Sequence, residues 1–312
     1  MSRLLVAGSL AYDRIMVFPG RFEQHLLKDA LHSINVCFSV TPPKEEFGGC
    51  AGNIAYTLSL LGGAPVILAT AGNDFARYEE HLKEEGVATT PIQVYGDVPS
   101  SSFYVITDEG NNQIGAFSHG ADAKPYTYDI DFNDVVLAIV APTGVEDMRE
   151  FPEKFKEANV PYLFDPGQQI TSLSADELRS GISSSRALLV NDYELALIVE
   201  KTEWDEERIA SETEMLIVTL GGAGSRIRTR DEAFHIEAVA AKSVVDPTGA
   251  GDAYRAGFMH ALAEGLSARE AMQVGSAVAA YAVECYGTQN HRFTLDELKT
   301  RYEDTYHSSF PL

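Results

Sequence analysis

The amino-acid sequence predicts an α/β fold in which helices cover both faces of a doubly wound, mostly parallel sheet. Short continuous apolar runs recur along the chain, as expected for strands buried on both faces of such a sheet. Helical patterns separate them, for example at 52–62 and 192–201, which is the alternation of βαβ units. The runs are LLVAG (4–8), PVILATAG (65–72), VVLAIVAP (135–142), VPYLFD (160–165), ALLVN (187–191) and MLIVTLGG (215–222).

Length and composition limit the class of protein. The 312 residues, 45% of them hydrophobic, suit one large α/β domain, alone or with a smaller attachment. The 46 acidic against 24 basic residues argue against a nucleic-acid binder, which needs a basic face for phosphates. No apolar segment approaches the roughly 20 residues of a membrane span. We therefore expect neither nucleic acid nor membrane as a partner.

The cysteines and the N-terminus indicate the compartment. Cys37, Cys50 and Cys285 are odd in number, widely spaced and without a CxxC pair. This pattern predicts a reducing compartment and argues against a zinc site. The short apolar run after Arg3 fits a first strand better than a signal peptide. The expected location is the cytoplasm.

Two stretches, 13–47 and 92–120, interrupt the βαβ rhythm. The first contains strand-like RIMVF and INVCFSV, the latter placing Cys37 in a strand. The second contains SSFYVITDEGNNQIGAF (101–117), which reads as a hairpin around a Gly-Asn-Asn turn. We expect a small antiparallel sheet that forms a discontinuous lid, while 1–12, 48–91 and 121–312 form the large domain. An exposed edge strand of the lid leaves open a homodimer through this sheet.

The stretch SVVDPTGAGDAYRAGF (243–258) carries the strongest chemical signal. An apolar helical pattern begins directly after its glycine turn, so the turn lies at a helix N-terminus. Backbone N–H groups are unpaired there and the dipole end is positive, which suits an anion. Gly249, Ala250 and Gly251 are thus candidates for an anion hole. Asp252 is a candidate general base for a hydroxyl, and its plainer alternative is a carboxylate that stabilises the helix start.

Polar residues also follow three of the predicted strands. Asp165, Asn191 and Thr219 each stand at or just after the end of an apolar run. Open α/β sheets bind ligands at the carboxyl ends of their strands. The alternative is that strand ends need turn residues in any case.

Four motifs in order resemble the ribokinase-like (PfkB) family of sugar and nucleoside kinases, over nearly the whole chain. They are GGCAGNIAYTLSLLGG (48–63), NDYE (191–194), TLGGAGS (219–225) and DPTGAGDAYRAGF (246–258). Within the family, FPGRFEQHLL (18–27), DPGQQI (165–170) and YGTQN (286–290) are similar to bacterial adenosine kinases. The resemblance implies ATP, Mg²⁺ and transfer of the γ-phosphoryl group to the 5′-hydroxyl of adenosine, giving AMP and ADP.

On the nucleotide side, the resemblance implies roles for several small and polar residues. Asn191 and Glu194 would order Mg²⁺ through water, and their alternative is a helix cap. Asp246 and Thr248 border a site for a monovalent cation such as K⁺, with helix capping as the alternative. Arg255 is a candidate phosphate contact. The residues expected along ATP are Thr219, Gly221, Gly222 and Gly224.

On the acceptor side, the resemblance implies a site for a nucleoside. Asp13 would accept from two ribose hydroxyls, and a surface turn is its alternative. Phe103 and Phe117 would sandwich the base, unless they only pack the hairpin. Cys37 stands where relatives carry a hydroxyl. The remaining expected contacts are Gly49 and Asn53 to the ribose, Gln168 and Gln169 to the adenine edge, and Ser9 to the base.

Other functions stay open at the level of sequence. A kinase of the same fold acting on ribose, fructose, inosine or guanosine is the main alternative, because only Gln168, Gln169 and the two phenylalanines point to adenine. A nucleoside-binding sensor without catalysis is a second alternative. A dinucleotide-binding protein is disfavoured, since GAGDAY lacks the third glycine of that motif and lies late in the chain.

Overall fold

The computed structural model describes residues 3–26, 35–110 and 112–312. Its larger sheet has eight strands in the order β14-β13-β12-β11-β10-β9-β1-β4. The strands from β12 to β4 are parallel, and the β13–β14 hairpin extends the sheet in antiparallel fashion. Their bounds are β1 (Arg3–Ala7), β4 (Ala64–Leu68), β9 (Val135–Val140), β10 (Tyr162–Phe164), β11 (Ala187–Asn191), β12 (Met215–Thr219), β13 (Ser225–Arg228) and β14 (Ala233–Ile236).

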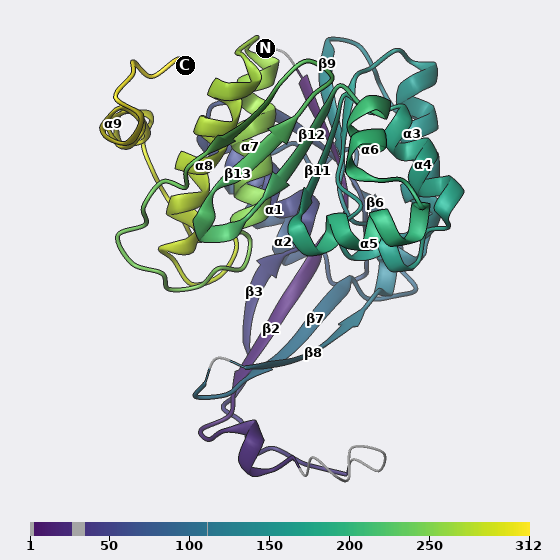
Figure 1. Ribbon diagram of the computed structural model, residues 1–312. Helices are drawn as coiled ribbons and strands as arrows, with labels where there is room; N and C mark the ends of the chain where they lie inside the picture. Colours follow the sequence, from purple (N-terminus) through teal and green to yellow (C-terminus); the bar gives the residue numbers. More distant parts are fainter. Residues whose placement is uncertain (1–2, 27–34, 111) are drawn as a thin grey trace.

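Helices cover both faces of this sheet, so the predicted doubly wound α/β fold is confirmed (Figure 1). In β1, Leu4 and Val6 face one core while Leu5 and Ala7 face the other, as the period of a strand requires. One core packs α1 (Cys50–Leu60), α2 (Ala76–Glu84), α7 (Ala250–Ala263), α8 (Ala268–Val283) and α9 (Leu295–Tyr306). The other packs α3 (Val145–Glu157), α4 (Ala175–Ser183), α5 (Asp192–Thr202) and α6 (Glu206–Glu212).

Several short elements complete the chain. A two-stranded parallel ladder joins β5 (Thr70–Ala71) to β6 (Gln93–Val94). The 3₁₀ turns are η1 (Phe22–Gln24), η3 (Gly120–Ala123), η4 (Gly167–Thr171) and η5 (Gly221–Ala223). In the described ranges, no helix is both long and apolar enough to cross a bilayer.

A smaller sheet projects from the body of the molecule, in the order β3-β2-β7-β8 (Figure 1). Its strands are β2 (Ala11–Val17), β3 (Lys44–Gly48), β7 (Ser101–Thr107) and β8 (Gln113–Ser118). The predicted hairpin at 101–117 is confirmed as β7–β8, although Asn111 of its turn lies outside the described residues. The sheet is not wholly antiparallel as predicted, because β2 and β7 run parallel. Between β2 and β7 the chain returns to the large sheet. Both strands therefore leave the large domain in the same direction.

The predicted strand at 34–40 is wrong. Residues 35–43 form no strand, and the strand of this region is β3 instead. Pro42 and Pro43 have no N–H group to donate, so they separate this segment from the ladder of β3. Cys37 is therefore an exposed residue outside any strand. Ile34, and Leu27 at the end of the 18–27 motif, lie outside the described residues.

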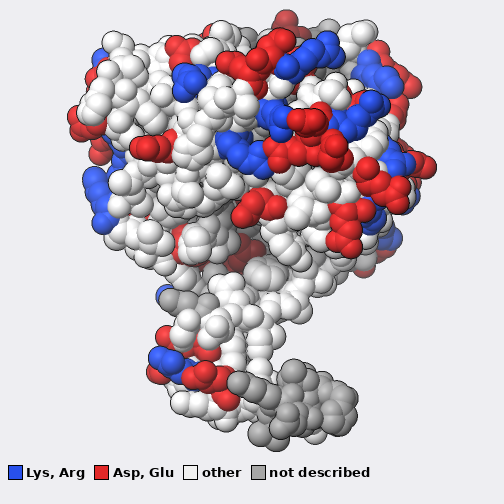
Figure 2. Space-filling view, viewed as in Figure 1, with Lys and Arg blue, Asp and Glu red and all other residues white. Residues whose placement is uncertain are grey.

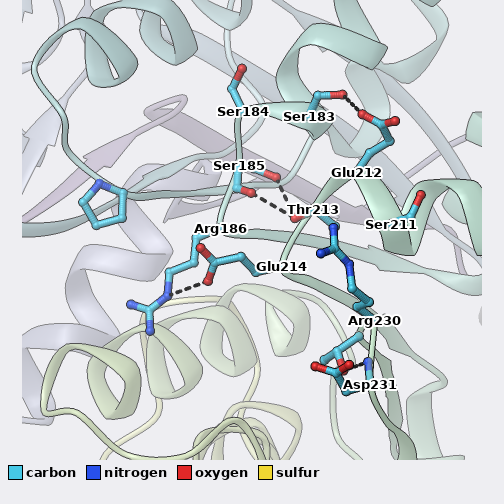
Figure 3. Close-up of a pocket in the computed structure, with 12 residues that line it drawn as sticks. Ser183, Ser184, Ser185, Arg186, Ser211, Glu212, Thr213, Glu214, Arg230 and Asp231 are labelled. Atoms are coloured by element: carbon cyan, nitrogen blue, oxygen red, sulfur yellow. Dashed lines mark hydrogen bonds and ion pairs between the residues drawn. The ribbon is translucent and has the colours of Figure 1, made fainter.

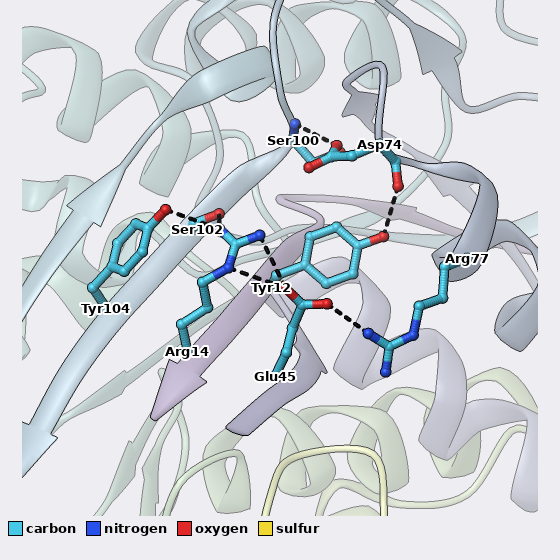
Figure 4. Close-up of polar contacts among 8 residues, drawn as sticks. All are labelled: Tyr12, Arg14, Glu45, Asp74, Arg77, Ser100, Ser102 and Tyr104. Atoms are coloured by element: carbon cyan, nitrogen blue, oxygen red, sulfur yellow. Dashed lines mark hydrogen bonds and ion pairs between the residues drawn. The ribbon is translucent and has the colours of Figure 1, made fainter. Parts of the chain in front are cut away.

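The smaller sheet is tied to α2 and the loop before it through its outer face (Figure 4). Glu45 accepts from Arg14 on β2 at 3.0 Å and from Arg77 on α2 at 2.5 Å. The Tyr12 hydroxyl donates to the backbone oxygen of Asp74 at 2.9 Å. Arg14 also donates to the hydroxyl of Tyr104 at 3.0 Å. Because neighbouring residues of a strand alternate, Asp13 points to the opposite face, toward the large sheet's strand ends.

Candidate active site

Asp252 lies in the first turn of α7, behind a glycine turn that reverses the backbone. Gly249, the N-cap, has φ +79°, a left-handed conformation that glycine adopts without cost. The carboxylate Oδ2 of Asp252 accepts from Asn53 Nδ2 on α1 at 2.8 Å. Burial raises the pKa of Asp252, while the charge of Arg255 and the hydrogen bond from Asn53 oppose that rise. The arrangement holds a half-buried carboxylate of raised pKa at a helix N-terminus.

The turn itself supplies fewer donors than predicted. Ala250 N–H already donates to the backbone oxygen of Pro247 at 3.2 Å. The N–H groups of Gly251 and Asp252 follow in the first turn, where a helix provides no partner. A side chain at Gly251 would meet Arg255 Nη1 at 2.5 Å, so the guanidinium lies directly over this turn. Backbone donors and one cation thus converge beside Asp252.

Asp165 holds Arg255 in this place. Arg255 Nε lies 2.5 Å from Asp165 Oδ2, and Nη2 donates to Oδ1 at 3.0 Å. Burial raises the pKa of Asp165 to about 7, against the lowering effect of the Arg255 charge. The carboxylate that follows β10 therefore orients the cation beside the turn.

The inner face of the smaller sheet brings three of the predicted acceptor residues into one row. Register pairs Asp13 with Glu46 on one side and Phe103 on the other, and Phe103 with Phe117. The Asp13 carboxylate packs against Gly48, and a Cβ at position 48 would lie only 2.4 Å from Asp13 Oδ2. Burial raises the pKa of Asp13 to about 7, and the charges of Asp252, Asp246 and Glu46 add to the rise. The acceptor face is thus strongly acidic.

Figure 2 shows the same feature on the surface. Acidic atoms lie inside the hollow between the body of the molecule and the projecting sheet, whereas both signs alternate over the body. Local donors must offset this acidity if an anion is to bind there.

The start of α1 closes the floor between the two sheets. Gly49 has φ +87°, and a side chain there would meet Ala11 N and Ser9 O at 2.6 Å. Ser9 Oγ accepts from Cys50 N at 3.3 Å, and Ser9 is buried. Ser9 and Gly49 therefore shape the backbone that carries Asn53 toward Asp252.

The two predicted glutamines lie differently. Gln169 is buried and its Nε2 donates to the backbone oxygen of Thr143 at 2.7 Å. Gln168 is exposed on η4. Phe103 packs over Gly115, whereas Phe117 is 40% exposed. Gln168 and Phe117 keep free surface for a ligand, while Gln169 holds a loop together.

On the nucleotide side, Asn191 and Glu194 form a capping box at the start of α5. Asn191 Oδ1 accepts from Glu194 N at 2.7 Å, and Glu194 Oε2 accepts from Asn191 N at 2.8 Å. Gly221 and Gly222 border open space, whereas a side chain at Gly224 would clash with Ile236 O at 2.1 Å. Thr219 ends β12 next to these glycines.

The part of the chain that the structure describes offers no dense cage for a metal. Among the described residues, no group of three or more His, Cys, Asp or Glu side chains has ligand geometry. The residues present fit Mg²⁺ held mainly by phosphates and water, since one Glu194 oxygen stays outside the capping box. Asp246 Oδ1 accepts from Thr248 N at 2.9 Å and Oδ2 from Gly287 N at 3.1 Å. Asp246 therefore joins the turn before α7 to the 286–290 loop.

Residues outside the predicted site also gather here. Gln289 Nε2 donates to Asn53 Oδ1 at 3.0 Å and to the Tyr78 hydroxyl at 2.6 Å. His119 Nδ1 lies 3.5 Å from Asp122 Oδ2, and its ring meets Phe117 edge-on at 5.1 Å. The YGTQN motif was the one sequence signal for Gln289, and none singled out the other three.

A separate polar pocket lies far from these residues, at the amino ends of β10, β11 and β12 (Figure 3). It is about 570 Å³ in volume and lined by serines together with Arg186, Glu214 and Arg230. Ligands of open α/β sheets bind at the opposite, carboxyl edge. The pocket is therefore not the candidate active site.

Comparison with known proteins identifies the family to which this chain is similar. The model of the pfkB family carbohydrate kinases matches residues 10–294. A nucleoside kinase of Methanocaldococcus jannaschii is 31% identical over 86% of this chain and 89% of its own. The Burkholderia thailandensis nucleoside kinase in complex with inosine is 37% identical, with a TM-score of 0.87 over 98% of this chain and 99% of the other. Its ADP-inosine complex is 38% identical, with a TM-score of 0.86 over 98% and 97% of the two chains.

Proposed function

This chain belongs to the pfkB family of carbohydrate kinases, and we propose that it transfers the γ-phosphoryl group of ATP to the 5′-hydroxyl of a purine nucleoside. One observation carries the proposal: a half-buried carboxylate, Asp252, lies between an acidic acceptor face and a helix N-terminus overlaid by Arg255. Proton acceptance and anion stabilisation are the two requirements of phosphoryl transfer to an alcohol.

In the proposed reaction, Asp13 accepts hydrogen bonds from the ribose hydroxyls and Asn53 contacts the same sugar. Asp252 takes the proton of the 5′-hydroxyl while the 5′-oxygen of the nucleoside bonds to the γ-phosphorus. The bond from that phosphorus to the bridging β–γ oxygen breaks, and ADP leaves. Gly251 N–H, Asp252 N–H and Arg255 hold the phosphoryl oxygens. Mg²⁺, ordered through water by Glu194 and Asn191, would neutralise phosphate charge.

The remaining assignments belong to the same proposal. The nucleotide lies along Thr219, Gly221, Gly222 and Gly224, where open space borders the two middle glycines. Phe117 and Phe103 contact the base, together with Gln168. Residues 13–47 and 92–120 act as a lid, which closes over the nucleoside and excludes water. A monovalent cation beside Asp246 is a further expectation of the resemblance.

The acceptor is proposed first as adenosine and, more broadly, as a purine nucleoside. Adenosine is the nucleoside that the motif resemblance implies. The inosine complex of the Burkholderia relative supports a wider range of purine nucleosides. Both share the ribose that Asp13 and Asn53 would hold, and they differ at the base edge near Gln168.

A substrate panel tests the proposal. Purified protein with ATP and Mg²⁺ is assayed for ADP formation with adenosine, inosine, guanosine, ribose and fructose, and the products are identified as 5′-monophosphates by mass spectrometry. We expect the highest kcat/KM with a purine nucleoside. Faster turnover of ribose or fructose would identify a sugar kinase, and tight adenosine binding without ADP formation would identify a sensor.

A further inference from the structure

A row of buried hydrogen bonds leads from Asp252 into the protein interior. Asn53 Nδ2 donates to Asp252 Oδ2 at 2.8 Å, and Gln289 Nε2 donates to Asn53 Oδ1 at 3.0 Å. Gln289 Oε1 lies 3.0 Å from His81 Nε2, which donates to it. Asn53 is 5% exposed and Gln289 3%, so water does not compete for these amides. The state of each amide therefore depends on its protein neighbours.

Tyr78 decides which way the Gln289 amide points. The Tyr78 hydroxyl donates its proton to the backbone oxygen of Gly48 at 2.7 Å. At 2.6 Å from Gln289 it can then only accept, so the Gln289 atom facing it is the nitrogen. His81 donates to the oxygen at the other end, and its ring is held by stacking on Phe47 at 4.1 Å. A reversed Gln289 amide would leave two oxygens facing each other at Asn53.

The orientation of Gln289 determines that of Asn53. With its oxygen held by Gln289, Asn53 must turn its N–H group toward Asp252. We propose that Gln289 is a positioning residue for the phosphoryl transfer: oriented by Tyr78 and His81, it keeps the Asn53 amide donating to Asp252. This inference rests on the proposed function, in which Asp252 is the general base.

The electrostatic surroundings explain why the direction of one amide matters. Burial raises the pKa of Asp252, and an N–H donor at 2.8 Å favours its ionised form. An amide oxygen at the same place would oppose ionisation. The titratable groups that interact with Asp252 from the elements around it are Asp13 on β2, Cys50 on α1, Tyr78 on α2, Asp165 after β10, Glu194 on α5 and Arg255 on α7.

Gln289→Glu tests the inference with a side chain of the same shape. A carboxylate at 289 accepts and does not donate, so the Asn53 amide is expected to turn its N–H group toward it and its oxygen toward Asp252. We expect kcat at neutral pH to fall on the order of tenfold, and the acid limb of the kcat profile to move upward by about one pH unit. Activity should recover as the pH is raised.

Two further variants keep the test decisive. Gln289→Met removes the amide's donor and its acceptor without adding charge. Asn53 is then free to rotate, and the acid limb of the kcat profile should move in the same direction. Gln273→Glu is the control for charge, because Gln273 on α8 bonds the Tyr302 hydroxyl and not the site. It should leave the profile unchanged. Melting temperatures of all variants separate lost stability from a changed base.

The outcomes are distinct. A wild-type pH profile in folded Gln289→Met, with or without a lower melting temperature, would show that Gln289 only packs the loop. An unshifted profile in folded Gln289→Glu would contradict the proposal equally. Wild-type protein that phosphorylates no nucleoside would remove the proposed function, and this inference with it.

Discussion

Arg255 and Asp165 form a buried ion pair, with side chains 12% and 2% exposed. Arg255 Nη2 donates to Asp165 Oδ1 at 3.0 Å, and Arg255 Nε lies 2.5 Å from Asp165 Oδ2. Such a pair stabilises little by itself, because both charges leave water. Loss of one partner is costly, since the other stays buried without compensation.

We therefore expect Arg255→Met to lower the free energy of unfolding by about 3–5 kcal/mol. Urea denaturation at neutral pH measures this change. Arg186→Met is the control, because Arg186 and Glu214 are 3.7 Å apart at a more exposed site, where the loss should stay below about 1 kcal/mol. Equal losses in the two variants would contradict the description of Arg255 as a buried, paired cation.

Asp252→Asn is expected to lower kcat by about 10²–10⁴-fold, because the amide cannot take the hydroxyl proton. ATP binding, measured by calorimetry, should persist. Asp176→Asn is the matched control: Asp176 is also a first-turn acid, at the start of α4, with its side chain 91% exposed. Near-normal turnover of Asp252→Asn would mean that Asp252 only stabilises the start of α7.

Asp147 predicts how stability depends on pH. Burial raises its pKa to about 7, and its Oδ1 accepts from Tyr126 N at 2.8 Å. A raised carboxyl pKa gives stability that is full below the unfolded value and is lost as pH rises through about 7. Asp147→Asn keeps the acceptor and removes this loss. The free energy of unfolding of Asp147→Asn should exceed that of the wild type at about pH 8, and the two should be nearly equal at about pH 4.

Chemical denaturation at the two pH values gives the comparison. Asp131→Asn is the control of opposite sign, because hydrogen bonds from Asn133 and Arg3 lower the pKa of exposed Asp131. Asp131→Asn should be less stable than the wild type at about pH 8, and the difference should vanish as the pH falls through the lowered pKa of Asp131. A constant difference between wild type and Asp147→Asn at all pH values would contradict the prediction.

His119 should respond to Asp122 across the 3.5 Å between them. A hydrogen bond to Asp122 raises the pKa of His119, so Asp122→Asn should lower it. NMR titration of the imidazole signals measures the change. Asp97→Asn, which removes an exposed partner of Lys124, serves as the control. An unchanged His119 titration in Asp122→Asn would exclude the pairing in solution.

The core of the fold was predictable because burial on both faces leaves a local pattern. Each of the six apolar runs overlaps a strand of the large sheet, and no strand begins more than one residue before its run. The pairing of β2 with β7 was not predictable, because the path of the chain between them decides it. The strand assigned around Cys37 failed because this segment forms no ladder and packs instead through Phe38 on Phe18 and Phe22.

The candidate site was predictable only where its residues share a motif. Asp252 stands beside its glycines in the sequence, and Asn53 follows Gly49 closely. Gln289 is 236 residues from Asn53 and 208 from His81, so no local pattern links them. For Asn191 and Glu194, one spacing serves both a cap and a metal site, so the sequence leaves both open, and the structure shows the capping box.

The smaller sheet has a consequence for biosynthesis. Arg14 on β2 and Tyr104 on β7 are contact partners 90 residues apart. In a nascent chain, the β2 edge stays exposed until the ribosome has also translated β7, about 90 residues later. During this interval the edge can pair with other chains. Slow translation between the two strands should therefore favour aggregation over the native enzyme.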